Sequence, residues 1–212
     1  LLCILVSASV GSASLTMGES LKILLAKLPI VSRDLSLDSI KPMYEVIVWK
    51  VRMPRILQAT LVGGSLAVVG CTFQAIFRNA LADPHILGIS SGASLGATIG
   101  IMSGMTLNFM GLGVTSIFAF IGAIFTVGLV YRLGTLGRRM VVTNILLVGT
   151  ALSTFLSAMI SLLMIYHREQ LEKVYLWTLG SFSSANWYKV SYMALITCLG
   201  IGIIWMFSPD LN

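Results

Sequence analysis

The amino-acid sequence predicts an all-α protein, a polytopic bundle of transmembrane helices. Composition is the first reason: of 212 residues, 57% are hydrophobic and only 10% are charged, whereas soluble domains are roughly 45–50% apolar and about 25% charged. The second reason is the length of the uncharged stretches, which match the ~20 apolar residues of a membrane-spanning helix. They are about twice as long as a tilted barrel strand and lack its polar alternation, so we expect helices.

Six such stretches follow one another and make up one expected transmembrane domain over residues 1–212. The expected spans cover residues 1–17, 56–77, 86–105, 107–130, 140–166 and 190–207. The first stretch is slightly short, and we interpret it as the end of a helix that begins upstream. A signal peptide is the alternative, but no basic segment precedes the apolar run.

Small residues predict a close helix contact in the third expected span. Gly92, Gly96 and Gly100 recur at intervals of four, which aligns them on one helix face. A neighbouring helix can approach such a face closely, and this packing replaces the hydrophobic driving force that lipid does not supply. Helix packing is the expectation, and a place in the lining of a transport pathway is the alternative.

Polar side chains inside the expected spans indicate candidate pathway residues. The fifth span carries hydroxyl groups at a spacing of three and four: Thr150, Ser153, Ser157 and Ser161. Such hydroxyls either bond to carbonyls of their own helix within a packing face or line a water-filled passage. Gln74, in the second span, needs a partner because an amide in hydrocarbon is costly to leave unpaired. A neighbouring helix or the passage would provide one.

Several classes of function lack their residues in this sequence. No ionisable residue lies in the middle of a span, which weighs against proton- or ion-coupled transport. The chain has no Gly-x-x-x-x-Gly-Lys-Ser/Thr phosphate loop, so we expect no ATPase site. We also expect no catalytic residues, metal site or cofactor, because paired carboxylates, a histidine cluster and metal-like cysteine spacing are missing. A secondary transporter or channel working without ATPase partners is the alternative function.

Two segments of the chain contain distinctive motifs. The first, residues 52–96, contains an Arg-x-Pro-Arg entry followed by "FRNALADP" and "LGISSGAS". The second contains "NILLVGTALSTFLSAMISLL" and, further on, "LWTLGSFSSANW". Both segments resemble the permease subunits of iron–siderophore, haem and cobalamin ABC importers, the FecCD type. The chain departs from the family pattern at Ala80, where proline is usual, and at His85, where glycine is usual.

The resemblance implies a permease that works with partners in the bacterial plasma (inner) membrane. The family subunit has about ten helices, so the chain resembles its N-terminal two thirds and is expected to be truncated. A homodimer of permeases would form the translocation pathway for iron chelates or related metal-chelate cargo. Two separate ATP-binding subunits would power transport, and an extracytoplasmic substrate-binding protein would deliver the cargo.

The resemblance also implies an orientation and a docking site. Charge alone leaves the orientation open, because the long segment 18–55 is rich in cations while the compact cluster at Arg132, Arg138 and Arg139 favours the reverse. Family topology places residues 18–55 outside the cell. Arg52 and Arg55 would then receive acidic residues of the binding protein, the alternative being arginines that extend to lipid headgroups.

Overall fold

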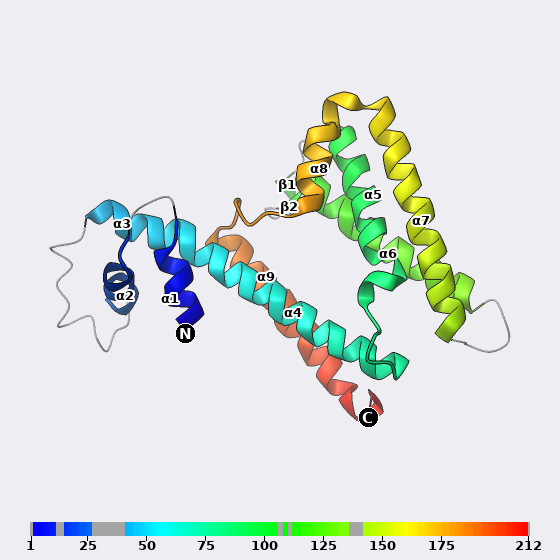
Figure 1. Cartoon of the computed structure of the whole chain (residues 1–212), viewed down its shortest axis with the longest axis horizontal. Coiled ribbons are helices and arrows are strands. Elements are labelled where there is room, and N and C mark those ends of the chain that lie inside the picture. Colours follow the sequence, from blue (N-terminus) through cyan, green and yellow to red (C-terminus); the bar gives the residue numbers. More distant parts are fainter. Residues whose placement is uncertain are drawn as a thin grey trace. The chain divides into compact units, whose positions relative to one another are not determined.

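The computed structural model describes residues 2–11, 15–26, 41–105, 108–109, 112–135 and 142–211 (Figure 1). These residues confirm the predicted fold class, because nearly all of them lie in helices or in the turns between helices. The chain divides into two compact units, one of residues 1–66 and 182–203 and one of residues 67–181 and 204–212. The predicted cations Arg138 and Arg139 lie outside the described residues.

The first unit is built around one long helix. Its elements are α1 (Leu2–Ser9), α2 (Met17–Leu25), α3 (Pro42–Val46), the π-helix η1 (Ile47–Arg52), the first half of α4 (Met53–Phe77) and most of α9 (Trp187–Met206). α3, η1 and α4 form one continuous helix of 36 residues. A helix of that length measures about 54 Å, whereas the hydrocarbon core is about 30 Å thick. The helix is therefore long enough to extend beyond the hydrocarbon.

A small apolar core joins α2 to the start of this long helix. It consists of the buried side chains of Leu15, Ile23, Val48 and Met53. α2 begins with a capping box in which the Thr16 hydroxyl accepts from the backbone N–H of Glu19 and the Glu19 carboxylate accepts from the backbone N–H of Thr16. The backbone N–H and the hydroxyl of Thr16 both donate to the Glu19 carboxylate and lower the pKa of that carboxyl, because they stabilise its charged form. The capping box therefore fixes where α2 begins.

The second unit is a compact group of helices. Its elements are η2 (Pro84–Leu87), α5 (Ile89–Met102), β1 (Asn108–Phe109), β2 (Leu112–Gly113), α6 (Val114–Gly134), α7 (Val142–Tyr166), η3 (Arg168–Gln170), α8 (Leu171–Leu179), η4 (Ser208–Leu211) and the ends of α4 and α9. β1 and β2 form a two-residue antiparallel hairpin with Asn108 opposite Gly113. The hairpin turns the chain between α5 and α6, which then pack against each other along their length.

The helix lengths refine the six expected spans. Four helices of the described part are long and apolar enough to cross a membrane: Pro42–Phe77, Val114–Gly134, Val142–Tyr166 and Trp187–Met206. The expected first span, 1–17, differs, because α1 ends at Ser9 and α2 begins at Met17. The expected third span, 86–105, is shortened to the 14 residues of α5. The reason is Gly88, whose left-handed backbone (φ 71°) separates η2 from α5.

Candidate functional site

The contact between α5 and α6 is made by glycines. A β-carbon on Gly96 would overlap the carbonyl oxygen of Phe118, and one on Gly92 would overlap the Thr126 hydroxyl and lie 2.7 Å from the Gly122 carbonyl oxygen. One on Gly122 would in turn overlap the carbonyl oxygen of Gly92. The structure therefore places the predicted glycine face against α6. The two helices are so close that only glycine, which lacks a β-carbon, fits at these positions.

The same close packing continues into η2 and α7. A β-carbon on Gly149 of α7 would overlap the carbonyl oxygen of Ile86 in η2. Gly88, at the end of η2, leaves room for the hydroxyl of Ser153, to which an added β-carbon would come within 2.8 Å. Gly134 similarly lets the end of α6 meet Ile145 of α7. Glycines therefore allow η2, α5, α6 and α7 to pack closely against one another.

The hydroxyl groups of α7 divide between two environments. Ser153 is half-buried beside η2, and its hydroxyl donates to the Gly149 carbonyl at 2.8 Å. From Thr150 onward, the exposed hydroxyls form a separate stripe: Thr150, Thr154, Ser157 and Ser161. Thr150, Thr154 and Ser161 each donate to a carbonyl of their own helix. Thr154 was missing from the expected set, although its position four residues after Thr150 would have indicated it.

Gln74 has a local partner. Its side-chain amide donates to the carbonyl oxygen of Ala80 at 3.1 Å, in the turn that follows α4. The backbone N–H of Asn79 also bonds to the Gln74 carbonyl oxygen, which closes the C-terminal end of the helix. The Gln74 side chain is exposed. This bond supplies the partner that the amide was expected to need, without a second helix.

Arg52 and Arg55 have different environments. The Arg52 side chain is 8% exposed, and its guanidinium donates to the carbonyl oxygens of Ala8 at 2.5 Å and Ser9 at 3.1 Å. Arg55 is exposed and donates to the carbonyl oxygen of Ser183 at 3.1 Å. Arg52 is thus enclosed at the end of α1, whereas Arg55 is exposed, and the docking role expected for both arginines stays a prediction.

An aromatic contact joins the start of the long helix to the start of α9. The rings of Trp49 and Trp187 stack with centroids 6.1 Å apart, and the Trp187 indole N–H donates to the Trp49 carbonyl oxygen at 2.8 Å. Lys189 holds the preceding segment by donating to the backbone and hydroxyl oxygens of Ser184 at 3.1 and 3.0 Å. Arg55 therefore lies beside a well-fixed surface segment.

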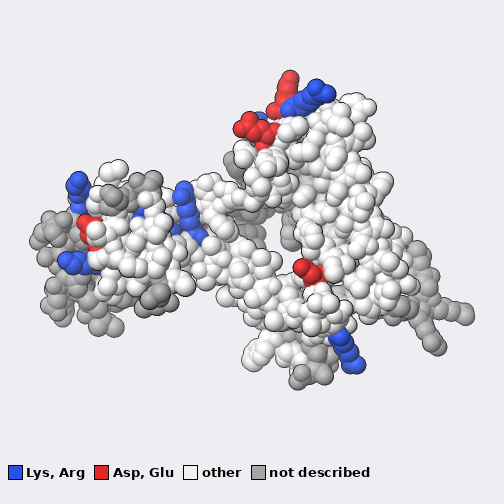
Figure 2. Space-filling view, viewed as in Figure 1, with Lys and Arg blue, Asp and Glu red and all other residues white. Residues whose placement is uncertain are grey.

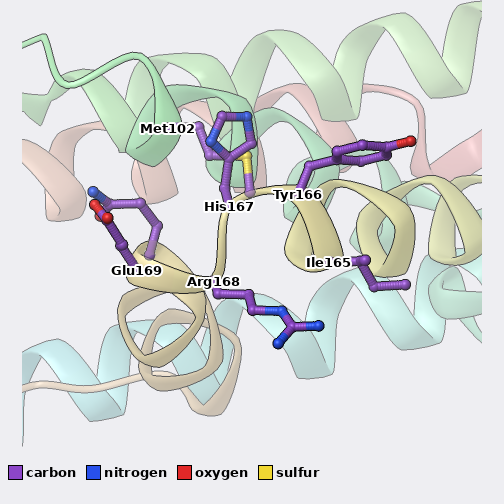
Figure 3. A pocket seen from close by; sticks show the side chains of 7 residues that line it. Met102, Ile165, Tyr166, His167, Arg168 and Glu169 are labelled. Carbon is purple, nitrogen blue, oxygen red and sulfur yellow. The ribbon is translucent and has the colours of Figure 1, made fainter.

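Charged side chains and a hollow beside α8 are further polar features of the described residues. On the face shown in Figure 2, charged side chains gather in a few places and leave broad uncharged surfaces between them. A hollow at the turn from α7 to α8 is lined by Met102, Ile165, Tyr166, His167, Arg168, Glu169 and Gln170 (Figure 3). Arg168 points away from the His167 ring, and the described residues contain no metal-binding group of three or more His, Cys, Asp or Glu.

Four apolar helices of membrane-spanning length place the chain in the class of multi-pass helical membrane proteins. Its residues 1–212 match the FecCD transport family, and the chain belongs to that family. The resemblance found in the two sequence segments is thereby confirmed. Permeases of this family are multi-pass proteins of the inner membrane, which confirms the expected location of this chain.

Known relatives agree with this assignment. The chain is 33% identical over 209 residues to the molybdate import system permease protein MolB of Haemophilus influenzae, covering 98% of this chain and 58% of that protein. It is 32% identical over 169 residues to the cobalamin import system permease protein BtuC of Halobacterium salinarum, covering 79% and 44%. A structure described as an inward-facing metal-chelate type ABC transporter has a TM-score of 0.72 and 32% identity over 92% of this chain and 62% of that chain. The chain thus spans between 44% and 62% of the length of these relatives.

Proposed function

We propose that the chain is part of the permease subunit of a binding-protein-dependent ABC importer, with iron chelates or related metal chelates as cargo. The observation that carries this proposal is the family match over residues 1–212. The relatives' cargoes, named as molybdate, cobalamin and metal chelates, share a metal centre held by other atoms. We therefore choose ferric chelate, cobalamin and molybdate as the cargo classes to test.

The helix surfaces support assembly with further membrane helices and a second permease subunit. Large apolar side chains are exposed on α6 and α7, with Phe120 and Phe125 each 68% exposed and Phe155 59% exposed. Exposed apolar surface of this extent has to be covered by lipid or by other helices. We propose that the 1–212 region acts as one transmembrane permease domain and that two copies of the full subunit form the pathway.

Energy for transport would come from separate ATP-binding subunits. The sequence has no phosphate-binding loop of the Walker type and no ionisable residue in the middle of a span that could couple transport to an ion gradient. The outer docking charge would be Arg55, which is exposed beside the fixed segment that contains Ser183. An acidic partner surface opposite this guanidinium would steer association.

The exposed hydroxyl stripe of α7 is the proposed pathway lining in the described region. Thr150, Thr154 and Ser161 donate to carbonyls of their own helix, and their oxygens can still accept hydrogen bonds from water. A passing polar cargo therefore meets a polar wall without a strong binding site.

Replacing Ser157 by leucine should lower cargo uptake by roughly tenfold, which corresponds to an increase of about 1.4 kcal/mol in the free-energy barrier to transport. The same replacement at the neighbouring exposed Ala158 is the control, because it adds equal bulk about 100° away around the helix. Equal uptake in both variants would remove the proposed lining.

The proposal is tested by uptake into vesicles that contain the full-length subunit. The permease is reconstituted with its ATP-binding subunits and its binding protein, loaded in turn with ferric chelate, cobalamin or molybdate. We expect uptake of one of them to require both ATP and the binding protein. Uptake that continues without the ATP-binding subunits would instead support the secondary transporter or channel.

A further inference from the structure

The helix α2 presents three different faces. Its core face carries Ser20 and Ile23, which are fully buried or nearly so. Its apolar face carries Met17 and Leu21, which lie one turn apart and are 53% and 39% exposed. Its polar face carries the exposed Lys22. At 100° per residue these three faces are roughly 120° apart around the helix, so each can meet a different environment.

The contact of α2 with the long helix fixes its level relative to the bilayer. The uncharged stretch of the long helix begins at Ile56. Along the helix axis, Met53 precedes that point by about 5 Å and Val48 by about 10 Å. The polar headgroup layer on each side of the hydrocarbon is roughly 5–8 Å thick. Because Ile23 packs in one cluster with Val48 and Met53, α2 lies at the level of the lipid headgroups.

The length and the side chains of α2 fit a helix that lies in the plane of the membrane surface. Its nine residues measure about 14 Å, which is too short to cross the bilayer. An interfacial helix buries its apolar face about 5–10 Å deep and carries basic residues on its polar side. Met17 and Leu21 meet the first requirement. Lys22 meets the second, because its long side chain can extend the ammonium group to a phosphate.

The charge of the surrounding segment also complements lipid phosphates. Residues 18–55 carry seven cationic and four acidic side chains. Of the cations, Lys22, Lys41 and Arg55 are exposed. In α3, at the start of the long helix, the apolar side chains of Met43 and Val46 are 69% and 49% exposed. Exposed apolar and cationic side chains thus occur together in this part of the first unit, as a bilayer surface requires.

We propose that α2 is an interfacial helix whose apolar face, Met17 and Leu21, inserts into the headgroup layer of the bilayer, with Lys22 against lipid phosphates. Since Ile23 joins α2 to Val48 and Met53, this insertion fixes the depth at which the long helix enters the membrane. The proposal concerns the contact with lipid, so it does not depend on the importer function or on the cargo.

Spin labels on single cysteines measure the depth of α2. The full-length permease is placed in vesicles of phosphatidylethanolamine and phosphatidylglycerol. Met17→Cys and Leu21→Cys carry the label on the apolar face. Gly18→Cys is the matched control, because Gly18 is exposed, lies about 40° from Lys22 around the helix and has nothing within 4 Å of an added β-carbon. The native cysteines are first replaced by alanine, which in this chain means Cys3, Cys71 and Cys198.

The two reagents that collide with the labels distinguish lipid from water. Molecular oxygen concentrates in the bilayer, whereas a hydrophilic nickel chelate stays in water. The ratio of oxygen to nickel accessibility should therefore be severalfold higher at positions 17 and 21 than at position 18. Equal ratios at the three positions would overturn the proposal, because they would place the apolar face in water. Labels at 17 and 21 that neither reagent reaches would overturn it too, by showing that protein covers this face.

Variants of Lys22 test the contact with phosphate. In the labelled Leu21→Cys protein, Lys22→Glu should lower the accessibility ratio toward the value at position 18, because a carboxylate is repelled by the lipid phosphates. Lys22→Arg keeps the charge and should keep the ratio. A ratio unchanged by Lys22→Glu would refute the phosphate contact. All the altered α2 positions are exposed, so these variants leave the core cluster around Ile23 intact.

Discussion

Replacing Gly122 by alanine is expected to disrupt the packing of α5 against α6. The added β-carbon would overlap the Gly92 carbonyl oxygen and lie 3.1 Å from the Gly92 carbonyl carbon and 3.2 Å from the Gly96 α-carbon. All of these are backbone atoms, which cannot rotate away as a side chain can. Overpacking typically costs about 1–3 kcal/mol, and we expect about 3 kcal/mol here because one whole helix has to move.

Thermal unfolding of the detergent-solubilised protein measures this effect. A loss of that size corresponds to a midpoint lowered by roughly 6–12 °C. Gly128→Ala is the matched control on the same helix, because a β-carbon there would meet nothing within 4 Å. Equal midpoints for Gly122→Ala and Gly128→Ala would contradict the glycine-mediated contact between α5 and α6.

Much of the fold could be predicted because it depends on local patterns. Long uncharged stretches indicated the four long helices, since bilayer thickness fixes the length of apolar sequence that a span requires. A spacing of four indicated a common face for Gly92, Gly96 and Gly100, although the partner helix α6 was not evident from that spacing. The shortness of α5 was missed because it depends on the backbone of Gly88, and a glycine inside an apolar run does not reveal its φ angle.

The candidate site was less predictable because it depends on tertiary contacts. Arg52 and Arg55 look equivalent in the sequence, yet the first binds carbonyl groups more than 40 residues away while the second remains exposed. The hydroxyl pattern of α7 was visible, but the pattern does not show which hydroxyls face η2. Ser153 was therefore grouped with residues of a different environment, and Thr154 was omitted.

Charge reversal at Arg55 is expected to have the largest effect on the proposed docking. The Arg55 guanidinium is exposed at the first turn of α4, where an acidic surface of a binding protein would meet it. Arg55→Glu would place like charges against each other, so association at low salt should slow at least tenfold. The sign of the salt dependence should also invert, because added salt would then screen a repulsion.

The association rate is measured with the full-length permease in nanodiscs and its purified binding protein, from about 10 mM to about 500 mM salt, a range over which the screening length falls several-fold. Arg55→Lys keeps the charge and should retain most of the wild-type rate. Arg78→Glu makes the same charge reversal at an exposed residue just beyond the other end of α4. Because a span of this length separates the two ends by the thickness of the membrane, Arg78→Glu should leave the outer association unchanged. A wild-type rate and salt dependence in Arg55→Glu would remove Arg55 from the docking surface.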